Sequence, residues 1–226
     1  MKLLVVEDEF EIRKQICLFF RGEGYVVESA ESYSDADEKL FMYDYDCVIV
    51  DITLPDGNGL DLIKLLKQKK SQSCIIVVSA RNSIEDKING LDIGADDYLS
   101  KPFSLAELNA RIKSVIRRRH YSGNKNVVFN EFRVCPESRQ LFVNEVEVQL
   151  TPKEYDLLTY FFMNKNRVLT KEGIVEHLWG DTMSIAADSF DFVYTHVRNL
   201  RRKITNAGGR DYIKSVYSIG YKFTEE

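Results

Sequence analysis

The segment CVIVDITLPDGNGLDLI, residues 47–63, joins a short apolar run to an aspartate and then to a turn rich in proline and glycine. Residues 47–50 are apolar, mostly β-branched and bounded by turn signals, which is typical of a strand buried on both faces of a parallel sheet. In open parallel sheets, ligands bind at the carboxyl ends of the strands, so Asp51 is a candidate site residue. The alternative is that Asp51 caps the following helix or lies in an ordinary loop.

The composition is that of a globular protein. The chain has 226 residues, of which 44% are hydrophobic and 12% aromatic, enough for one large domain or two ordinary ones. Its four cysteines are scattered and form no C-x-x-C pair, which favours reduced thiols over a zinc site. The N-terminal LLVV run is too short for a signal peptide, and no later run reaches the length of a membrane span. We therefore expect a cytoplasmic protein with no membrane segment.

Charge is distributed unevenly along the chain. Residues 1–117 hold 15 Lys or Arg and 21 Asp or Glu, a net charge of −6, whereas residues 118–226 hold 16 and 14, a net charge of +2. Between Tyr194 and Lys222, seven basic residues accompany one acid, Asp211. This asymmetry indicates an acidic regulatory half and a half that contacts polyanions.

The first half alternates strand-like runs with helical periodicity. The runs LLVV, YVVES, CVIVD, CIIVVS and DYLS predict five strands separated by helices. This order predicts an α/β fold with a doubly wound, five-stranded parallel sheet of the flavodoxin-like class. The sequence SLAE, which begins at Ser104, predicts a capping box at the start of a helix that runs to IRRR. We place a first domain at residues 1–118 and a linker at residues 119–126.

Residues 127–226 predict a winged helix-turn-helix domain. Several short strands with turn signals come first, as in a small antiparallel sheet. The sequence TPKE, residues 151–154, then combines a threonine cap, a proline at the first helical position and a glutamate that completes a capping box. Further helices are expected at about 171–178 and 187–205, and YIKSVYSIGYKF closes the chain as a hairpin.

Chemically active side chains follow the strands of the first half. Glu7 and Asp8 follow the first predicted strand, Asp51 the third and Lys101 the fifth, while Ser79 ends the fourth. Because the first, third and fourth strands lie together in a doubly wound sheet, these side chains should converge on one crevice. Three close carboxylates need a compensating cation, and Mg2+ is the oxygen-seeking candidate.

This combination of groups suits phosphoryl transfer. Asp51 can act as a carboxylate nucleophile toward phosphorus, while Mg2+ and Lys101 neutralise the phosphoryl oxygens and the Ser79 hydroxyl donates to one of them. Each residue alone has an ordinary alternative, as a charge near a helix N-terminus, a loop hydroxyl or a solvated lysine. Their shared position at four strand ends favours a site.

Several motifs resemble a known family. The sequences LLVVEDE, VIVDITLPDGNGLDL, VVSARN and GLDIGADDYLSKPF resemble the receiver domain of bacterial two-component response regulators. The sequences LTPKEYDLL, VRNLRRKI and IGYKF resemble the effector domain of the OmpR/PhoB type. The resemblance spans almost the whole chain. It implies that Asp51 accepts a phosphoryl group from a sensor histidine kinase, and that Mg2+ is bound by Glu7, Asp8, Asp51 and the backbone carbonyl of Thr53.

The same resemblance implies a conformational switch. Ser79 would move its hydroxyl to the phosphoryl group, and the ring of Tyr98 would turn into the vacated space. The Lys101–Pro102 bond is expected to be cis, which X-Pro bonds adopt readily. Thr53 and Arg81, each two positions beyond a site residue, are candidates for setting the lifetime of the phosphate.

The resemblance further implies a homodimer on phosphorylation, built on the last two receiver helices and the strand between them. Matching positions give the cross-protomer pairs Lys87 with Glu107, Asp97 with Arg111, and Asp96 with Arg118. Surface ion pairs contribute about 0 to 1 kcal/mol each, so they would select geometry more than drive association. Apolar packing around Ile88, Leu91 and Leu108 is expected to supply more.

The helix expected at 187–205 has two distinct faces, of which one is apolar and carries Phe190, Val193, Val197, Leu200 and Ile204. The other presents Thr195, Asn199 and Arg202, and the residues that flank them are Asp188, Asp191, Arg198 and Arg201. In the major groove of double-stranded DNA, Arg can bind phosphate or guanine, and Asn can bind adenine. A solvated charged face is the alternative.

The terminal hairpin departs from the family pattern. Tyr217 and Ser218 stand where the family has an arginine followed by glycine, so we expect Lys214, Tyr217 or Lys222 to contact the DNA backbone without base readout. The loop LWGDTMS, residues 178–184, corresponds to a segment that can touch RNA polymerase, although Trp179 has the alternative of a core anchor.

We therefore predict a phosphorylated transcription regulator and not a turnover enzyme, one that accepts a phosphoryl group and loses it by autodephosphorylation. One rival is a haloacid-dehalogenase-like phosphotransfer hydrolase, but such enzymes place the nucleophile after their first strand in a D-x-D pattern. Asp51 follows the third strand and is succeeded by IT. The other rival is a DNA-binding regulator that is never phosphorylated, against which the complete acidic set and the lysine argue.

Overall fold

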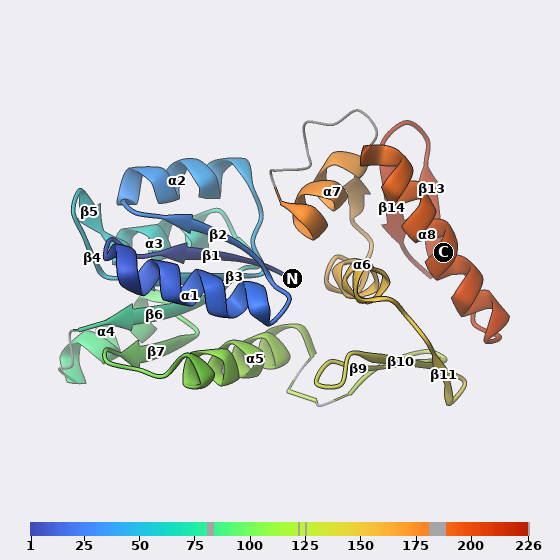
Figure 1. Cartoon of the computed structure of the whole chain (residues 1–226), viewed down its shortest axis with the longest axis horizontal. Coiled ribbons are helices and arrows are strands. Elements are labelled where there is room, and N and C mark those ends of the chain that lie inside the picture. Colours follow the sequence, from blue (N-terminus) through green and yellow to red (C-terminus); the bar gives the residue numbers. More distant parts are fainter. Residues whose placement is uncertain (81–83, 122, 125, 181–188, 226) are drawn as a thin grey trace. The chain divides into compact units, whose positions relative to one another are not determined.

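The computed structural model describes residues 1–80, 84–121, 123–124, 126–180 and 189–225. They form two compact units, Met1–Arg119 and His120–Glu226 (Figure 1). The helix that ends unit 1 continues to Tyr121, so its last turn extends into the segment assigned to a linker. Within the described residues, no helix is both long and apolar enough to cross a membrane.

Unit 1 is built on a parallel sheet with the strand order β2-β1-β3-β6-β7. Its strands are β1 (Lys2–Val6), β2 (Val26–Ala30), β3 (Cys47–Asp51), β6 (Cys74–Ser79) and β7 (Asp97–Ser100). Every residue of β1, β3 and β6 is buried, which explains why these runs are almost continuously apolar. The predicted five-stranded, doubly wound sheet is confirmed.

The helices of unit 1 are α1 (Phe10–Gly22), α2 (Tyr33–Met42), α3 (Gly59–Gln68), α4 (Ile84–Ile93) and α5 (Leu105–Tyr121). The predicted start of α5 is confirmed, because the backbone N–H of Glu107 donates to Ser104 Oγ at 3.0 Å. The carboxylate of Glu107 instead accepts from Arg111. A short hairpin of β4 (Thr53–Leu54) and β5 (Gly57–Asn58), which the sequence did not predict, links β3 to α3.

Unit 2 combines two antiparallel sheets with three helices. One sheet holds β8 (Val127–Phe129), β9 (Phe132–Cys135), β10 (Gln140–Val143) and β11 (Val146–Val148). The other holds β12 (Val168–Thr170), β13 (Ile213–Val216) and β14 (Gly220–Phe223). The helices are α6 (Pro152–Met163), α7 (Lys171–Trp179) and α8 (Ser189–Asn206). The predicted winged helix-turn-helix is confirmed, with β12 added to the terminal hairpin.

Local signals and tertiary packing agree at the helices of unit 2. Both halves of the capping box between Thr151 and Glu154 are present at α6. On α8, Val193, Val197, Leu200 and Ile204 are buried in the core cluster of the unit, as predicted. The prediction for Phe190 is wrong, since it is 37% exposed. It lies in the first turn of α8, at the edge of the apolar seam, and is outside that core cluster.

We predict that Gly59→Ala destabilises unit 1, because a Cβ at Gly59 would lie 2.0 Å from the carbonyl oxygen of Asp51 and 2.8 Å from Val50 Cγ1. The carbonyl oxygen of Asp51 cannot move without shifting the backbone of β3, so the cost should be about 1–3 kcal/mol or more. Calorimetry of the full chain should show a lower melting temperature for the transition of this unit.

Gly22→Ala is the matched control for this substitution. Gly22 also lies in a helix, and no atom lies within 4 Å of an added Cβ, so alanine should leave the melting temperature unchanged or slightly raised. Equal melting temperatures for the two variants would contradict the close approach of α3 to β3.

Candidate functional site

Three carboxylates meet at the carboxyl edge of the sheet in unit 1. Glu7 and Asp8 directly follow β1, and Asp51 ends β3. The two strands pair in register, with Val6 opposite Val50, so their ends lie side by side. One oxygen from each of the three carboxylates lies within 4.8 Å of the others, with Glu7 and Asp51 buried and Asp8 exposed. The predicted convergence of these acids is present.

Lys101, which directly follows the edge strand β7, joins this cluster. Its Nζ donates to Asp51 Oδ2 at 2.6 Å and to Glu7 Oε1 at 2.7 Å. The backbone N–H of Lys101 donates to the carbonyl oxygen of Ser79 at 2.8 Å, which ties the residue to the end of β6. The Lys101–Pro102 bond is cis, as expected.

The site has more negative charge than Lys101 can balance. Burial raises the pKa of Glu7, against the effect of its hydrogen bond from Lys101, and the neighbouring Asp51 and Asp8 raise it further. Burial opposes the charge of Lys101, yet hydrogen bonds to Asp51 and Glu7 hold its pKa above the ordinary value. Glu7 Oε2 is buried without a hydrogen-bond partner among the described residues. An acidic set with one unsatisfied buried oxygen fits a hard divalent cation.

The turn after β3 orients the carboxylate of Asp51. Its Oδ1 accepts the backbone N–H of Thr53 at 3.0 Å, while Oδ2 is held by Lys101. The carboxylate is therefore fixed at both oxygens, and Asp51 is buried. The role of the Thr53 carbonyl as a metal ligand stays a prediction.

Arg13 supports the cluster and was not singled out from the sequence. Its Nη1 donates to the carbonyl oxygens of Glu7 at 2.6 Å and of Asp8 at 3.0 Å, and its Nη2 pairs with Glu31 at 2.9 Å. These bonds fix the backbone between β1 and α1. Only its place in the first turns of α1, a few residues after the acids, could have indicated this role.

The two residues of the predicted switch lie in or beside the same sheet. Ser79 is buried at the end of β6, one residue beyond Val78, which pairs with Asp51. Tyr98 on β7 is also buried, and its ring packs on α4, because an added Cβ at Gly90 would lie 3.1 Å from it. Arg81, a candidate for setting phosphate lifetime, lies outside the described residues.

The residues of the predicted dimer face lie on α4, β7 and α5, with Asp96 directly before β7, and several pair within the chain. Arg111 donates to Asp97 at 3.0 and 3.2 Å and to Glu107 at 2.8 and 3.1 Å. Arg118 Nη2 lies 3.3 Å from the carbonyl oxygen of Asp96. Lys87 is part of α4. The cross-protomer pairs therefore stay a prediction.

The apolar part of that face differs from the expectation. Ile88 and Leu91 on α4 are 53% and 45% exposed and remain available for packing. The expectation for Leu108 is wrong, because it is 0% exposed within unit 1. It lies on the buried side of α5 together with Ile112 and Val115.

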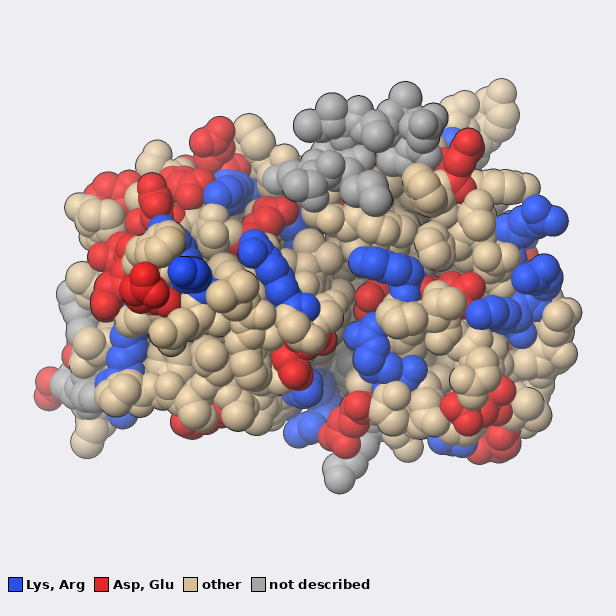
Figure 2. All heavy atoms as spheres, in the orientation of Figure 1, with Lys and Arg blue, Asp and Glu red and all other residues tan. Residues whose placement is uncertain are grey.

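In unit 2, the polar face of α8 is partly engaged within the chain. Thr195, Arg198 and Arg202 are exposed, and Asn199 Oδ1 lies 3.5 Å from Arg202 Nη2. Arg201 instead pairs with Asp211 through both Nε and Nη2. On the face shown in Figure 2, basic side chains gather over unit 2 where α8 lies, and acidic ones gather over α1 and α2 of unit 1.

The hairpin β13–β14 adds basic and aromatic groups. Lys214 and Lys222 are direct cross-strand neighbours, and Tyr217 at the turn is 94% exposed. Two ammonium groups placed opposite each other repel, which favours a nearby polyanion. The direct opposition of the two lysines was not deduced from the sequence, because it depends on the register of the hairpin.

Comparisons with known proteins agree with both units. A response regulator receiver domain matches residues 3–113, and a transcriptional regulatory protein C-terminal domain matches residues 145–223. The phosphate regulon transcriptional regulatory protein PhoB of Klebsiella pneumoniae is 34% identical over 226 residues, covering 99% of this chain and 97% of that protein. The alkaline phosphatase synthesis transcriptional regulatory protein PhoP of Bacillus subtilis is 34% identical over 235 residues, with the same coverages. Among solved structures, a Francisella response regulator receiver domain is 34% identical with a TM-score of 0.50, covering 52% of this chain and 97% of that one.

We predict that Glu7→Gln stabilises the metal-free protein at pH 7. Burial raises the pKa of Glu7 above its usual 4.5, so the folded protein binds more protons than the unfolded chain. The free energy of unfolding therefore falls as the pH rises from about 4.5 through the raised pKa. In EDTA, the melting temperature of unit 1 should decrease over this window in the wild type and decrease less in Glu7→Gln.

Added MgCl2 distinguishes the effect of metal binding on stability from the effect of the buried charge of Glu7. It should raise the melting temperature of the wild type and have little effect on Glu7→Gln. Glu31→Gln, which removes an exposed carboxylate that pairs with Arg13, should keep the response of the wild type. A Glu7→Gln protein that is less stable than the wild type in EDTA at pH 7 would contradict the unfavourable burial of Glu7.

Proposed function

Because this chain belongs to the OmpR/PhoB-type response regulators of two-component systems, we propose that a sensor histidine kinase phosphorylates Asp51 and thereby controls DNA binding. The chain is a response regulator that regulates transcription, and its relatives are transcriptional regulators. One observation carries the proposal: Asp51 is buried beside Glu7 and Asp8, with Lys101 Nζ 2.6 Å from its carboxylate. This arrangement is what an aspartate needs to receive a phosphoryl group.

The transfer follows from these contacts. A carboxylate oxygen of Asp51 attacks phosphorus, the bond between phosphorus and the histidine nitrogen of the kinase breaks, and the imidazole takes up a proton. Lys101 stabilises the negative charge on the phosphoryl oxygens, and the Ser79 hydroxyl donates to one of them. Glu7, Asp8, Asp51 and the Thr53 carbonyl would hold Mg2+, which when bound would supply the remaining positive charge.

The phosphorylation of Asp51 can be reversed by hydrolysis in the same site. Water attacks phosphorus, the bond between phosphorus and Asp51 breaks, and inorganic phosphate leaves. The protein thus returns to its starting state and does not turn over an external substrate. Thr53, whose backbone N–H binds the Asp51 carboxylate, is the candidate within the described residues for setting the lifetime of the phosphate.

Phosphorylation acts through the face formed by α4, β7 and α5. Ser79 moves toward the phosphoryl group, and the buried ring of Tyr98, which packs on α4, responds to this movement. A population shift requires the phosphorylated state to favour the dimer by differential contacts. The exposed Ile88 and Leu91 supply apolar area for a second copy, while the charged pairs fix its orientation.

The dimer places two winged helices on tandem half-sites of double-stranded DNA. In each, α8 enters the major groove, with Asn199 and Arg202 at base edges and Thr195 and Arg198 beside them. Lys214, Lys222 and Tyr217 meet the DNA backbone from the hairpin. RNA polymerase is a further proposed partner of the 178–184 loop, of which residues 181–184 lie outside the described part. Trp179 itself packs against the core of unit 2, which supports its reading as an anchor.

We predict that the full chain gains one phosphoryl group when incubated with Mg2+ and acetyl phosphate, and that Asp51→Asn gains none. Intact-mass spectrometry measures the gain, which should be acid-labile, and light scattering should detect the dimer of the phosphorylated protein. Asp61→Asn is the control, because Asp61 is an exposed aspartate that only pairs with Lys64. An equal gain in Asp51→Asn and wild type would refute the proposed phosphoacceptor.

We predict that Asn199→Ala and Arg202→Ala each weaken specific DNA binding by about 5- to 150-fold, as expected for the loss of one base contact. Fluorescence anisotropy at a fixed salt concentration, on a site selected from random DNA, measures the effect. Thr205→Ala is the control on the same helix, because the Thr205 hydroxyl donates to the backbone carbonyl oxygens of Arg201 and Arg202. Unchanged specific binding in both variants would exclude this face as the reading surface.

A further inference from the structure

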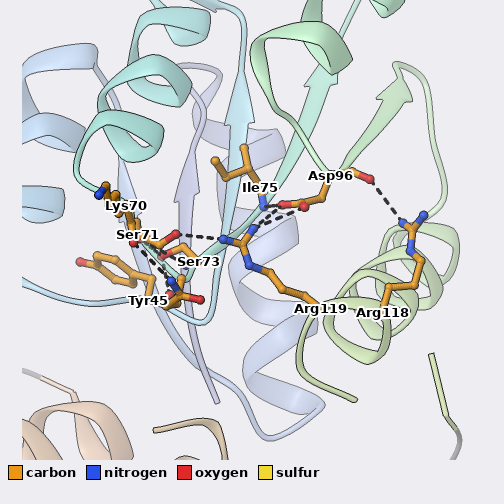
Figure 3. A network of polar contacts seen from close by, with 9 residues as sticks. Tyr45, Lys70, Ser71, Ser73, Ile75, Asp96, Arg118 and Arg119 are labelled. Carbon is orange, nitrogen blue, oxygen red and sulfur yellow. Dashed lines mark hydrogen bonds and ion pairs between the residues drawn. The ribbon is translucent and has the colours of Figure 1, made fainter. Parts of the chain in front are cut away.

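Arg119, near the end of α5, bridges two other parts of unit 1 (Figure 3). Its Nη1 lies 3.2 Å from Asp96 Oδ2 and 3.4 Å from Oδ1, and its Nη2 donates to the carbonyl oxygen of Ser71 at 2.9 Å. The side chains of Arg119 and Asp96 are only 23% and 26% exposed. This pair is thus more enclosed than a typical surface ion pair.

Both acceptors are held in place independently of Arg119. Asp96 Oδ2 accepts the N–H of Ile75 at 2.8 Å, and the N–H of Asp96 donates to the carbonyl of Ile75 at 2.8 Å. Ser71 Oγ contacts Ser73 Oγ at 2.9 Å, and Ser73 Oγ donates to the carbonyl of Tyr45 at 2.6 Å. The guanidinium therefore sits between two fixed acceptors, which makes its position persistent.

The neighbouring Arg118 behaves differently, as Figure 3 shows. It turns to the other side of Asp96 and lies 3.3 Å from the backbone carbonyl, not at the carboxylate. Within one chain, the Asp96 carboxylate is therefore paired with Arg119. The proposed dimer, in contrast, needs this carboxylate for Arg118 of a second copy.

We propose that Arg119 opposes dimerisation by keeping the Asp96 carboxylate paired within its own chain. This inference rests on the dimer proposed above. One carboxylate balances one guanidinium, so a second arginine at Asp96 would face repulsion from Arg119. For the new pair to gain its full attraction, Arg119 must withdraw and lose its bonds to both Asp96 and Ser71.

This competition also concerns the end of α5. Arg119 lies two residues before the last residue of the helix, Tyr121, and is its tie to the loop that carries Ser71. When Arg119 withdraws, the last turn of α5 loses that tie. Formation of the dimer is thereby coupled to release of the helix end that leads out of the receiver.

The test compares three variants of the full chain that remove the same charge: Arg119→Gln, Arg118→Gln and Lys113→Gln. Dimer Kd is measured by analytical ultracentrifugation with Mg2+ and acetyl phosphate, and melting temperatures verify folding. Arg119→Gln should tighten the dimer about threefold or more, and Arg118→Gln should weaken it about threefold or more, given two symmetric pairs per dimer. Lys113, an exposed lysine on α5 whose nearest carboxylate is 3.9 Å away, should have little effect.

The outcomes are distinct. An Arg119→Gln dimer equal to or weaker than wild type overturns the role of Arg119 while leaving the dimer itself in place. Wild-type protein that is phosphorylated but stays monomeric refutes the proposed dimer, and the inference falls with it. If Arg119→Gln fails to fold, Arg119→Met replaces it, because methionine also removes the positive charge at Asp96 while keeping a long unbranched side chain on α5; it too should tighten the dimer.

Discussion

The short contacts of Lys101 with Asp51 and Glu7 are the interaction on which the rest of unit 1 depends. Lys101 lies 94 positions after Glu7 and 50 positions after Asp51 in the sequence. Only the strand order β2-β1-β3-β6-β7 brings the three residues to the carboxyl edge of the sheet. Without the ammonium, two buried carboxylates would stand together beside an exposed third. The burial of the apolar strands β1 and β3 offsets the free-energy cost of holding these charges together. The close packing of the same strands keeps the acids from moving apart.

Much of this could be predicted from sequence, since strand ends in a doubly wound sheet converge by topology alone. The acids and the lysine were found this way, and the caps at Ser104 and Thr151 were found from the capping-box pattern. The partners of long side chains were not, because an arginine such as Arg13 or Arg119 selects its acceptor by local geometry that leaves no pattern in the sequence. Strand β12 was missed for a similar reason: three residues carry no periodicity, and only pairing with β14 defines them.

Helical periodicity gives the direction of a side chain but not its burial. It placed Phe190 in the buried seam of α8, although this ring is 37% exposed and lies beside Lys171 Nζ. The family resemblance, not the periodicity, placed Leu108 on the dimer face, whereas Leu108 is 0% exposed within unit 1. The same limit applies to charge. Arg201 is paired with Asp211, and Lys203 donates to the buried Glu154 at 2.6 Å, so these two position α8 within the unit. Only part of the basic face, with Arg198 and Arg202, is then left for nucleic acid, and counting charges along α8 overestimates its capacity to bind phosphate.

The intrachain pairs of the α4–β7–α5 face have a consequence for switching. Arg111 already satisfies Asp97 and Glu107, and Arg119 already satisfies Asp96, so the proposed dimerisation would exchange pairs instead of creating them. An exchange of comparable ion pairs is close to neutral in free energy. The proposed balance between monomer and dimer would then be set by the apolar area at Ile88 and Leu91, by the bond of Arg119 to Ser71 and by the state of Asp51. Because a nearly balanced equilibrium responds to a small differential free energy, one phosphoryl group on Asp51 would be enough to move it.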